Sequence, residues 1–335
     1  MLFNNFAEGA ENASAVIYSL KGCALHPDER SFFKEANPLG FILFARNCEN
    51  IEQLKTLTND LRESVGRNCP ILIDQEGGRV QRLKPPVWRQ YPPMKDFGDK
   101  ALEDMDGALE RLRFTILQMA EELSECGVNV NCAPVLDVLD TQTHDAIGDR
   151  AFSDDPDIVA RLGLSVCRNF IAAGLTPVIK HMPGHGRGKV DSHKDLPRIS
   201  ESLDELQKTD FEPFRVVSQS DVGHAVWGMA AHILYDVLDP DHPASVSPEI
   251  LQKTLREDIG FKGFLVSDDL DMDALAAYGD VAERAQACLK AGCDAALHCS
   301  GELAVMEKIA KTVPNLSAKA RKTLQKAAEN SNMAA

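Results

Sequence analysis

The segment KHMPGHGRGKVDSHKDLP, residues 180–197, concentrates three histidines and two aspartates between glycines and prolines. His181, His185 and His193 could bind a metal, exchange protons with a substrate, or lie on an ordinary solvated loop. Their spacings of four and eight residues cannot form the one-face helical pair of a zinc enzyme, because Pro183 and the glycines prevent a helix. A metal site is therefore the minority interpretation, and the other two stay open on these residues alone.

Other ionisable residues directly follow short apolar runs. Asp268 ends such a run in VSDDLDM. The acids that follow it, Asp269, Asp271 and Asp273, could simply belong to the first turn of the next helix. His232 is as readily a structural histidine as a ligand contact. Arg82 and Arg150 lie in turn-rich loops that would place them on the same face. The residues immediately past an apolar run are Asp74, Lys180, His181, His232 and Asp268.

Eight apolar runs alternate with amphipathic segments, which predicts a parallel α/β fold and, at this length, a (β/α)₈ TIM barrel. The strand-like runs are Ala15–Leu20, Gly40–Phe44, Ile71–Ile73, Val128–Asn131, Thr176–Ile179, Ala225–Met229, Gly263–Val266 and Ala295–Leu297. The helical segments are Pro27–Glu35, Ile51–Val65, Leu102–Cys126, Asp157–Ala173, Ser202–Ser218, Ser247–Asp258, Val281–Ala291 and Glu302–Lys311. We expect one catalytic domain over residues 1–335, with a terminal helix and tail from about 315. Chemistry in such a barrel lies at the carboxyl ends of the strands.

The charge balance excludes several classes of protein. The 335 residues carry a formal net charge of −15, which disfavours binding to nucleic acid or to an anionic membrane surface. The N-terminal sequence has no basic region followed by a long apolar run, so we expect no signal peptide. Nine scattered cysteines without a C-x-x-C pair are typical of reduced thiols. The sequence therefore predicts a cytoplasmic protein.

Several blocks together resemble a known family. KHMPGHGRGKVDSH is similar to the signature of the bacterial β-N-acetylhexosaminidases of glycoside hydrolase family 3. IDQEGGRVQRL, GDRAF, MAAH, VSDDLDM and AGCDAALHCSG resemble further family blocks in the expected order, from about residue 39 to residue 301. The family fold is a (β/α)₈ barrel, which agrees with the strand pattern.

The resemblance implies retaining hydrolysis through a covalent glycosyl-enzyme intermediate. It assigns Asp268 as the nucleophile and His193 as the acid/base, with Asp191 as the partner of that histidine. It implies no cofactor and no metal, and it leaves His185 with a loop-structuring role, in a Gly/Pro-rich segment 184–188 that fits a lid. The sugar-binding positions implied by the resemblance are Asp74, Arg82, Arg150, Lys180 and His181.

The implied substrate is a small saccharide or muropeptide with a terminal β-linked GlcNAc, above all GlcNAc-1,6-anhydro-MurNAc and its peptides from cell-wall recycling. We expect a monomer. A β-glucosidase of the same family, a non-catalytic sugar-binding barrel and a metallohydrolase are the alternatives. Two positions depart from the family pattern. These are Met182 and Asp271, and Asp271 would raise the pKa of Asp268 if the two side chains faced each other.

Overall fold

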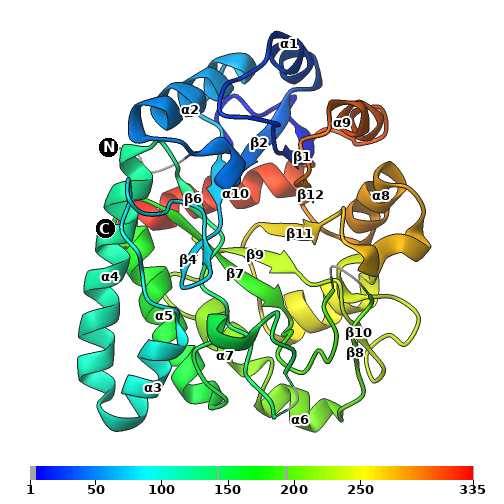
Figure 1. The fold of residues 1–335 in the computed structure, drawn as a ribbon. Coiled ribbons are helices and arrows are strands. Elements are labelled where there is room, and N and C mark those ends of the chain that lie inside the picture. Colours follow the sequence, from blue (N-terminus) through cyan, green and yellow to red (C-terminus); the bar gives the residue numbers. More distant parts are fainter. Residues whose placement is uncertain (1–4, 142, 193–194, 335) are drawn as a thin grey trace.

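The computed structural model describes residues 5–141, 143–192 and 195–334, and in this part of the chain parallel strands close into a barrel surrounded by helices (Figure 1). In the order around the barrel the strands are β1 (Ser14–Tyr18), β2 (Pro38–Leu43), β3 (Ile71–Ile73), β6 (Val130–Asn131), β7 (Thr176–Met182), β9 (Trp227–Ala230), β11 (Leu265–Asp269) and β12 (Ala295–His298), which pairs with β1. Each of the eight apolar runs overlaps one of these strands. The predicted (β/α)₈ barrel is confirmed.

The strands are buried on both faces, which explains their continuous apolar sequences. Because side chains alternate along a strand, successive residues of β1 enter two separate apolar clusters. Ile17 belongs to a cluster with Val178 and Val266 inside the barrel. Val16 and Tyr18 belong to a second cluster, between the strands and the helices.

The helices that surround the barrel start and end at sequence signals. Helix α2 is typical: the Asn50 side chain accepts a hydrogen bond from the N–H of Gln53, and Gly66 ends the helix with φ of 67°. The α-helices are α1 (Pro27–Ala36), α2 (Ile51–Val65), α3 (Lys95–Glu103), α4 (Met105–Glu125), α5 (Pro156–Ala172), α6 (Leu203–Lys208), α7 (Glu212–Ser218), α8 (Val281–Ala291), α9 (Leu303–Ala310) and α10 (Ala318–Ala334). A π-helix, η4, spans Ile250–Asp258, and short 3₁₀ helices are η1 (Ala45–Asn47), η2 (Gly148–Arg150), η3 (Ala244–Val246) and η5 (Asp273–Tyr278). Two small sheets pair β4 (Gln75–Gly77) with β5 (Val80–Gln81) and β8 (Arg198–Ile199) with β10 (Leu234–Tyr235).

The helix predicted over Ser202–Ser218 is wrong as a single element, because the chain breaks between α6 and α7. The break lies at Thr209 and Asp210, and the Asp210 carboxylate accepts a hydrogen bond from the Arg187 guanidinium at 2.7 Å. Pro213 then lies in the first turn of α7, where its missing N–H is tolerated. An apolar pattern that continues through the break conceals it from periodicity alone.

One end of the barrel is closed by the C-terminal helix. Leu316, Ala320 and Leu324 join the apolar cluster inside the barrel together with Phe6. Asn315 forms an antiparallel bridge with Ser14 at the start of β1, so α10 covers the amino ends of the strands. Within the described residues, no helix combines the length and apolarity needed to cross a membrane. All nine cysteines are free thiols, and seven of them are buried.

Candidate active site

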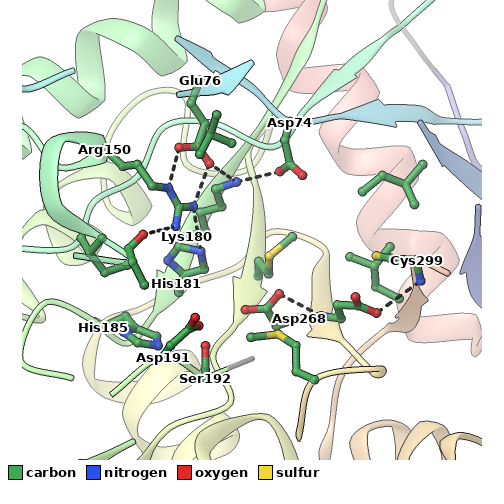
Figure 2. Close-up of a pocket in the computed structure, with 18 of the residues that line it drawn as sticks. Asp74, Glu76, Arg150, Lys180, His181, His185, Asp191, Ser192, Asp268 and Cys299 are labelled. Carbon is green, nitrogen blue, oxygen red and sulfur yellow. Dashed lines mark hydrogen bonds and ion pairs between the residues drawn. The ribbon is translucent and has the colours of Figure 1, made fainter. Parts of the chain in front are cut away.

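A pocket of about 290 Å³ lies at the carboxyl ends of the strands, opposite α10 (Figure 2). Its floor and walls come from residues at or just past the ends of β2, β3, β7, β9, β11 and β12. The lining residues include Phe44, Asp74, Glu76, Arg82, Arg150, Lys180, His181, His185, Asp191, Asp268, Asp269, Met272 and Cys299.

Charged residues on one side of the pocket form a connected set of ion pairs, and Figure 2 shows those among Asp74, Glu76, Arg150 and Lys180 as dashed lines. Lys180 Nζ lies 2.8 Å from Asp74 Oδ1 and 2.6 Å from Glu76 Oε1. Arg150 binds the Glu76 carboxylate with two hydrogen bonds, each of 2.8 Å, from Nε and Nη2. Arg82 reaches the other oxygen of Asp74 at 2.9 Å. Two carboxylates and three cations therefore hold one another in fixed positions along one side of the pocket. We call this set of five residues the charged rim.

Burial makes these pairs strong. The Lys180 and Glu76 side chains are only 3% and 2% exposed. Burial alone would raise the pKa of Glu76, but the Arg150 and Lys180 cations outweigh it and lower that pKa to about 2. Burial and cations oppose each other in the same way at Asp74, whose pKa falls well below its usual value through Lys180 and Arg82. Both carboxylates are thus ionised at neutral pH.

Asp268 occupies the predicted position at the end of β11, with its carboxylate in the pocket. Its Oδ1 accepts a hydrogen bond of 2.8 Å from the N–H of Asp269. Burial would raise the pKa of Asp268, but His181 and His232 lower it below its usual value. The side chain is therefore an ionised carboxylate, as a nucleophile must be.

Asp271 is turned toward His298, so the condition under which it would raise the pKa of Asp268 is not met. Its Oδ2 instead lies 3.0 Å from Nδ1 of the buried His298. The charge of Asp271 acts on Asp269, whose pKa is raised first by burial and then by this neighbour. Side-chain atoms of Asp269, Asp271 and His298 that could bind a metal ion lie within 4.8 Å of one another. Asp269 Oδ1 also accepts hydrogen bonds from the N–H groups of Asp271 and Cys299, which is the arrangement of a loop-bracing carboxylate.

His232 is a structural histidine, which decides between the two roles left open by the sequence. It is fully buried, its Nδ1 lies 2.7 Å from Ser245 Oγ, and its Nε2 lies 3.0 Å from the backbone oxygen of Asp269. Both ring nitrogens are therefore engaged, and the residue does not line the pocket. It supports the end of β11 from behind.

The two histidines at the start of the loop share one buried carboxylate, that of Asp137. Asp137 Oδ2 lies 2.7 Å from His181 Nδ1, and Oδ1 accepts hydrogen bonds from the N–H groups of His181 and His185 at 3.1 and 2.7 Å. Burial would raise the pKa of Asp137, yet these neighbours lower it to about 2. The His185 ring is 3% exposed and its Nδ1 has no hydrogen-bond partner within the described part of the chain. Burial, and then the neighbouring His181, lower the pKa of His185 to about 4.

The segment Gly184–Gly188, predicted as a lid, is anchored at several points. Thr143 Oγ1 donates a hydrogen bond of 2.6 Å to the Gly186 carbonyl, and the N–H of His144 donates to Gly188 at 3.1 Å. Arg187 Nε pairs with the buried Asp210 at 2.7 Å. Because its glycines are buried and its carbonyls are bonded, this segment is a fixed base of the loop rather than a lid.

Seven of the eight sequence-predicted site residues line the one pocket: Asp74, Arg82, Arg150, Lys180, His181, Asp191 and Asp268. The eighth, His193, lies outside the described residues. Sequence reasoning missed Glu76 and Asp137. A signal for Asp137 exists, because a lone carboxylate inside the apolar run APVLDVL must find a buried partner.

Comparison with known proteins agrees with this geometry. The profile of the glycosyl hydrolase family 3 N-terminal domain matches residues 17–330. A β-hexosaminidase of Neisseria gonorrhoeae is 41% identical over 262 residues, 78% of this chain and 71% of the relative. A β-hexosaminidase of Tolumonas auensis is 37% identical over 295 residues, 87% of this chain and 85% of the relative.

A solved structure extends the likeness to the fold. The crystal structure of NagZ from Neisseria gonorrhoeae in complex with N-trifluoroacetyl-D-glucosamine superposes with a TM-score of 0.85 at 35% identity, covering 94% of this chain and 90% of that one. The family match and the curated relatives show that this barrel is a glycoside hydrolase. The chain belongs to glycosyl hydrolase family 3, as the sequence blocks predicted.

Proposed function

We propose that this chain is a retaining exo-β-N-acetylglucosaminidase that removes terminal, non-reducing β-linked GlcNAc. The observation that carries the proposal is the ionised Asp268 at the end of β11, which shares one pocket with the loop residue Asp191 and the charged rim. The β-hexosaminidase relatives and the sugar complex of the Neisseria structure support this choice of sugar.

In the proposed first step, the Asp268 carboxylate attacks the anomeric carbon while His193 protonates the leaving oxygen. A covalent glycosyl–Asp268 ester forms and the aglycone leaves. In the second step His193 removes a proton from water, which attacks the same carbon and releases the sugar with its configuration retained. Asp191 would hydrogen-bond one nitrogen of the imidazole and stabilise its cationic form. The charged rim, through Asp74, Arg82, Arg150 and Lys180, would bind the ring hydroxyls together with His181.

The choice of an imidazole as acid/base suits an anionic aglycone. A muropeptide leaving group carries carboxylates, and a second anionic side chain at that position would repel them. We therefore propose GlcNAc-1,6-anhydro-MurNAc and its peptides as substrates, with a role in peptidoglycan recycling and cell-wall turnover. The corresponding proposal for the whole protein is a cytoplasmic, monomeric, single-domain enzyme.

Two comparisons test the proposal against its alternatives. We expect hydrolysis of 4-nitrophenyl β-GlcNAc, unaffected by a chelator, with a β-configured first product by NMR. A clear preference for the β-glucoside would indicate a β-glucosidase, and loss of activity with chelator would indicate a metallohydrolase. Binding without turnover would indicate a non-catalytic barrel. The Asp268→Asn variant is the control, because it should bind the sugar without turnover.

A further inference from the structure

Asp137 combines complete burial with contacts to two residues of the pocket. It follows β6, its side chain is 0% exposed, and it does not line the pocket itself. Its two oxygens accept three N–H groups, from the ring and backbone of His181 and from the backbone of His185. A buried carboxylate that accepts three hydrogen bonds and does not reach the pocket cannot touch a substrate. It can act only through the residues that it binds.

The surroundings of the His181 ring determine which of its nitrogens carries the proton. Nδ1 lies 2.7 Å from the ionised Asp137 carboxylate, which can only accept a hydrogen bond. Nε2 lies 3.4 Å from Arg150 Nη2, and a guanidinium can only donate. The carboxylate therefore holds a hydrogen on Nδ1, and the guanidinium favours a lone pair on Nε2.

We propose that Asp137 is a positioning residue that locks His181 in the Nδ1–H tautomer, so that Nε2 faces the pocket as a hydrogen-bond acceptor. The role rests on the proposed function, in which His181 binds a sugar hydroxyl. That hydroxyl must then donate its hydrogen to Nε2. A bare oxygen or a fluorine in its place could not donate to Nε2.

The consequence for specificity follows from the lost hydrogen bond. A sugar that lacks the donating hydroxyl cannot make this hydrogen bond, so it should bind more weakly than the parent sugar. Asp137 thus sets the polarity of one recognition contact without touching the substrate. Arg150, which is bound to Glu76, lies next to the other nitrogen of the ring.

The direct test needs no substrate, so its result is independent of the proposed catalytic activity. Long-range ¹H–¹⁵N NMR of the full chain, with His181 assigned by the missing signals of His181→Gln, reports the tautomer at neutral pH. We expect protonated Nδ1 and unprotonated Nε2 in the wild type, and a mixture of tautomers in Asp137→Asn. Asp210→Asn is the matched control, because Asp210 is also fully buried and also anchors the loop but contacts Arg187 instead. An Nε2–H tautomer in the wild type would overturn the proposal.

A double-mutant cycle separates positioning from general support of the fold. We expect Asp137→Asn to lower kcat/KM for 4-nitrophenyl β-GlcNAc by about 10- to 100-fold, the range for losing a buried partner of a functional histidine. In the His181→Gln background the same substitution should cost less than about threefold. An equal loss in both backgrounds would mean that Asp137 acts through His185 or the fold, and would refute the proposal. If Asp137→Asn does not fold, the wild-type tautomer alone decides.

Discussion

Replacing Glu76 by Gln isolates the energetic role of buried charge in the pocket. Glu76 is 2% exposed and makes two hydrogen bonds of 2.8 Å to Arg150 and one ion pair of 2.6 Å to Lys180. The neutral amide keeps the shape of the side chain but leaves both cations without this counter-charge. Removing one partner of a buried ion pair costs about 3–5 kcal/mol.

The lowered pKa gives an independent magnitude. The pKa of Glu76 falls from an ordinary 4.5 to about 2, which corresponds to roughly 3 kcal/mol of stability at neutral pH. Because the pKa is lower in the folded state, this stability is present above pH 4.5 and is lost as the pH falls toward 2. Glu76→Gln should therefore be less stable at pH 7 and should lose less further stability between those two pH values.

The assay is urea denaturation at several pH values, with Asp99→Asn as the control. Asp99 also lies 2.6 Å from a lysine, Lys95, but this pair is about half exposed. Its loss should cost less than about 1 kcal/mol. The reasoning is refuted if Glu76→Gln and Asp99→Asn cost the same.

Two further predictions concern the loop base. In Gly186→Ala the new Cβ would lie 1.7 Å from the Val138 carbonyl oxygen, so this variant should lower the free energy of unfolding by about 1–3 kcal/mol. The control is Gly22→Ala, whose Cβ would lie in open space and which should change the free energy of unfolding by less than about 0.5 kcal/mol. Equal thermal shifts for the two variants would contradict this. The pKa of His185 falls from 6.5 to about 4 on folding, so the unfolded chain takes up this proton first and stability should decline as the pH falls from 6.5 to 4. His185→Gln should have a flatter pH–stability curve in that window, and parallel curves would exclude the buried neutral imidazole.

The sequence predicts the fold well because strands that are buried on both faces consist of continuous apolar runs. Continuous apolar runs such as Ile71–Ile73 coincide with strands, and the polar residues after them reach one pocket because all parallel strands end at the same side of the barrel. The break between α6 and α7 escapes periodicity. It depends on a contact between Asp210 and Arg187, which are 23 residues apart.

The partners of the site residues could not be predicted from spacing. Glu76 stands in the same quoted block as Asp74, but its contact with Arg150 joins positions 74 residues apart. The sequence gives no reason to prefer this pairing over a solvated glutamate. Asp137 is hidden in the same way, since its role depends on His181 from the neighbouring strand.

The central claim is that Asp268 forms a covalent bond with the sugar. Incubation with a 2-acetamido-2-deoxy-5-fluoro glycosyl fluoride, followed by proteolysis and mass spectrometry of the labelled peptide, tests it directly. The account predicts time-dependent inactivation with one label per chain, on Asp268. A label on Asp269, Asp271 or any other residue, or hydrolysis without a trapped ester, would contradict it.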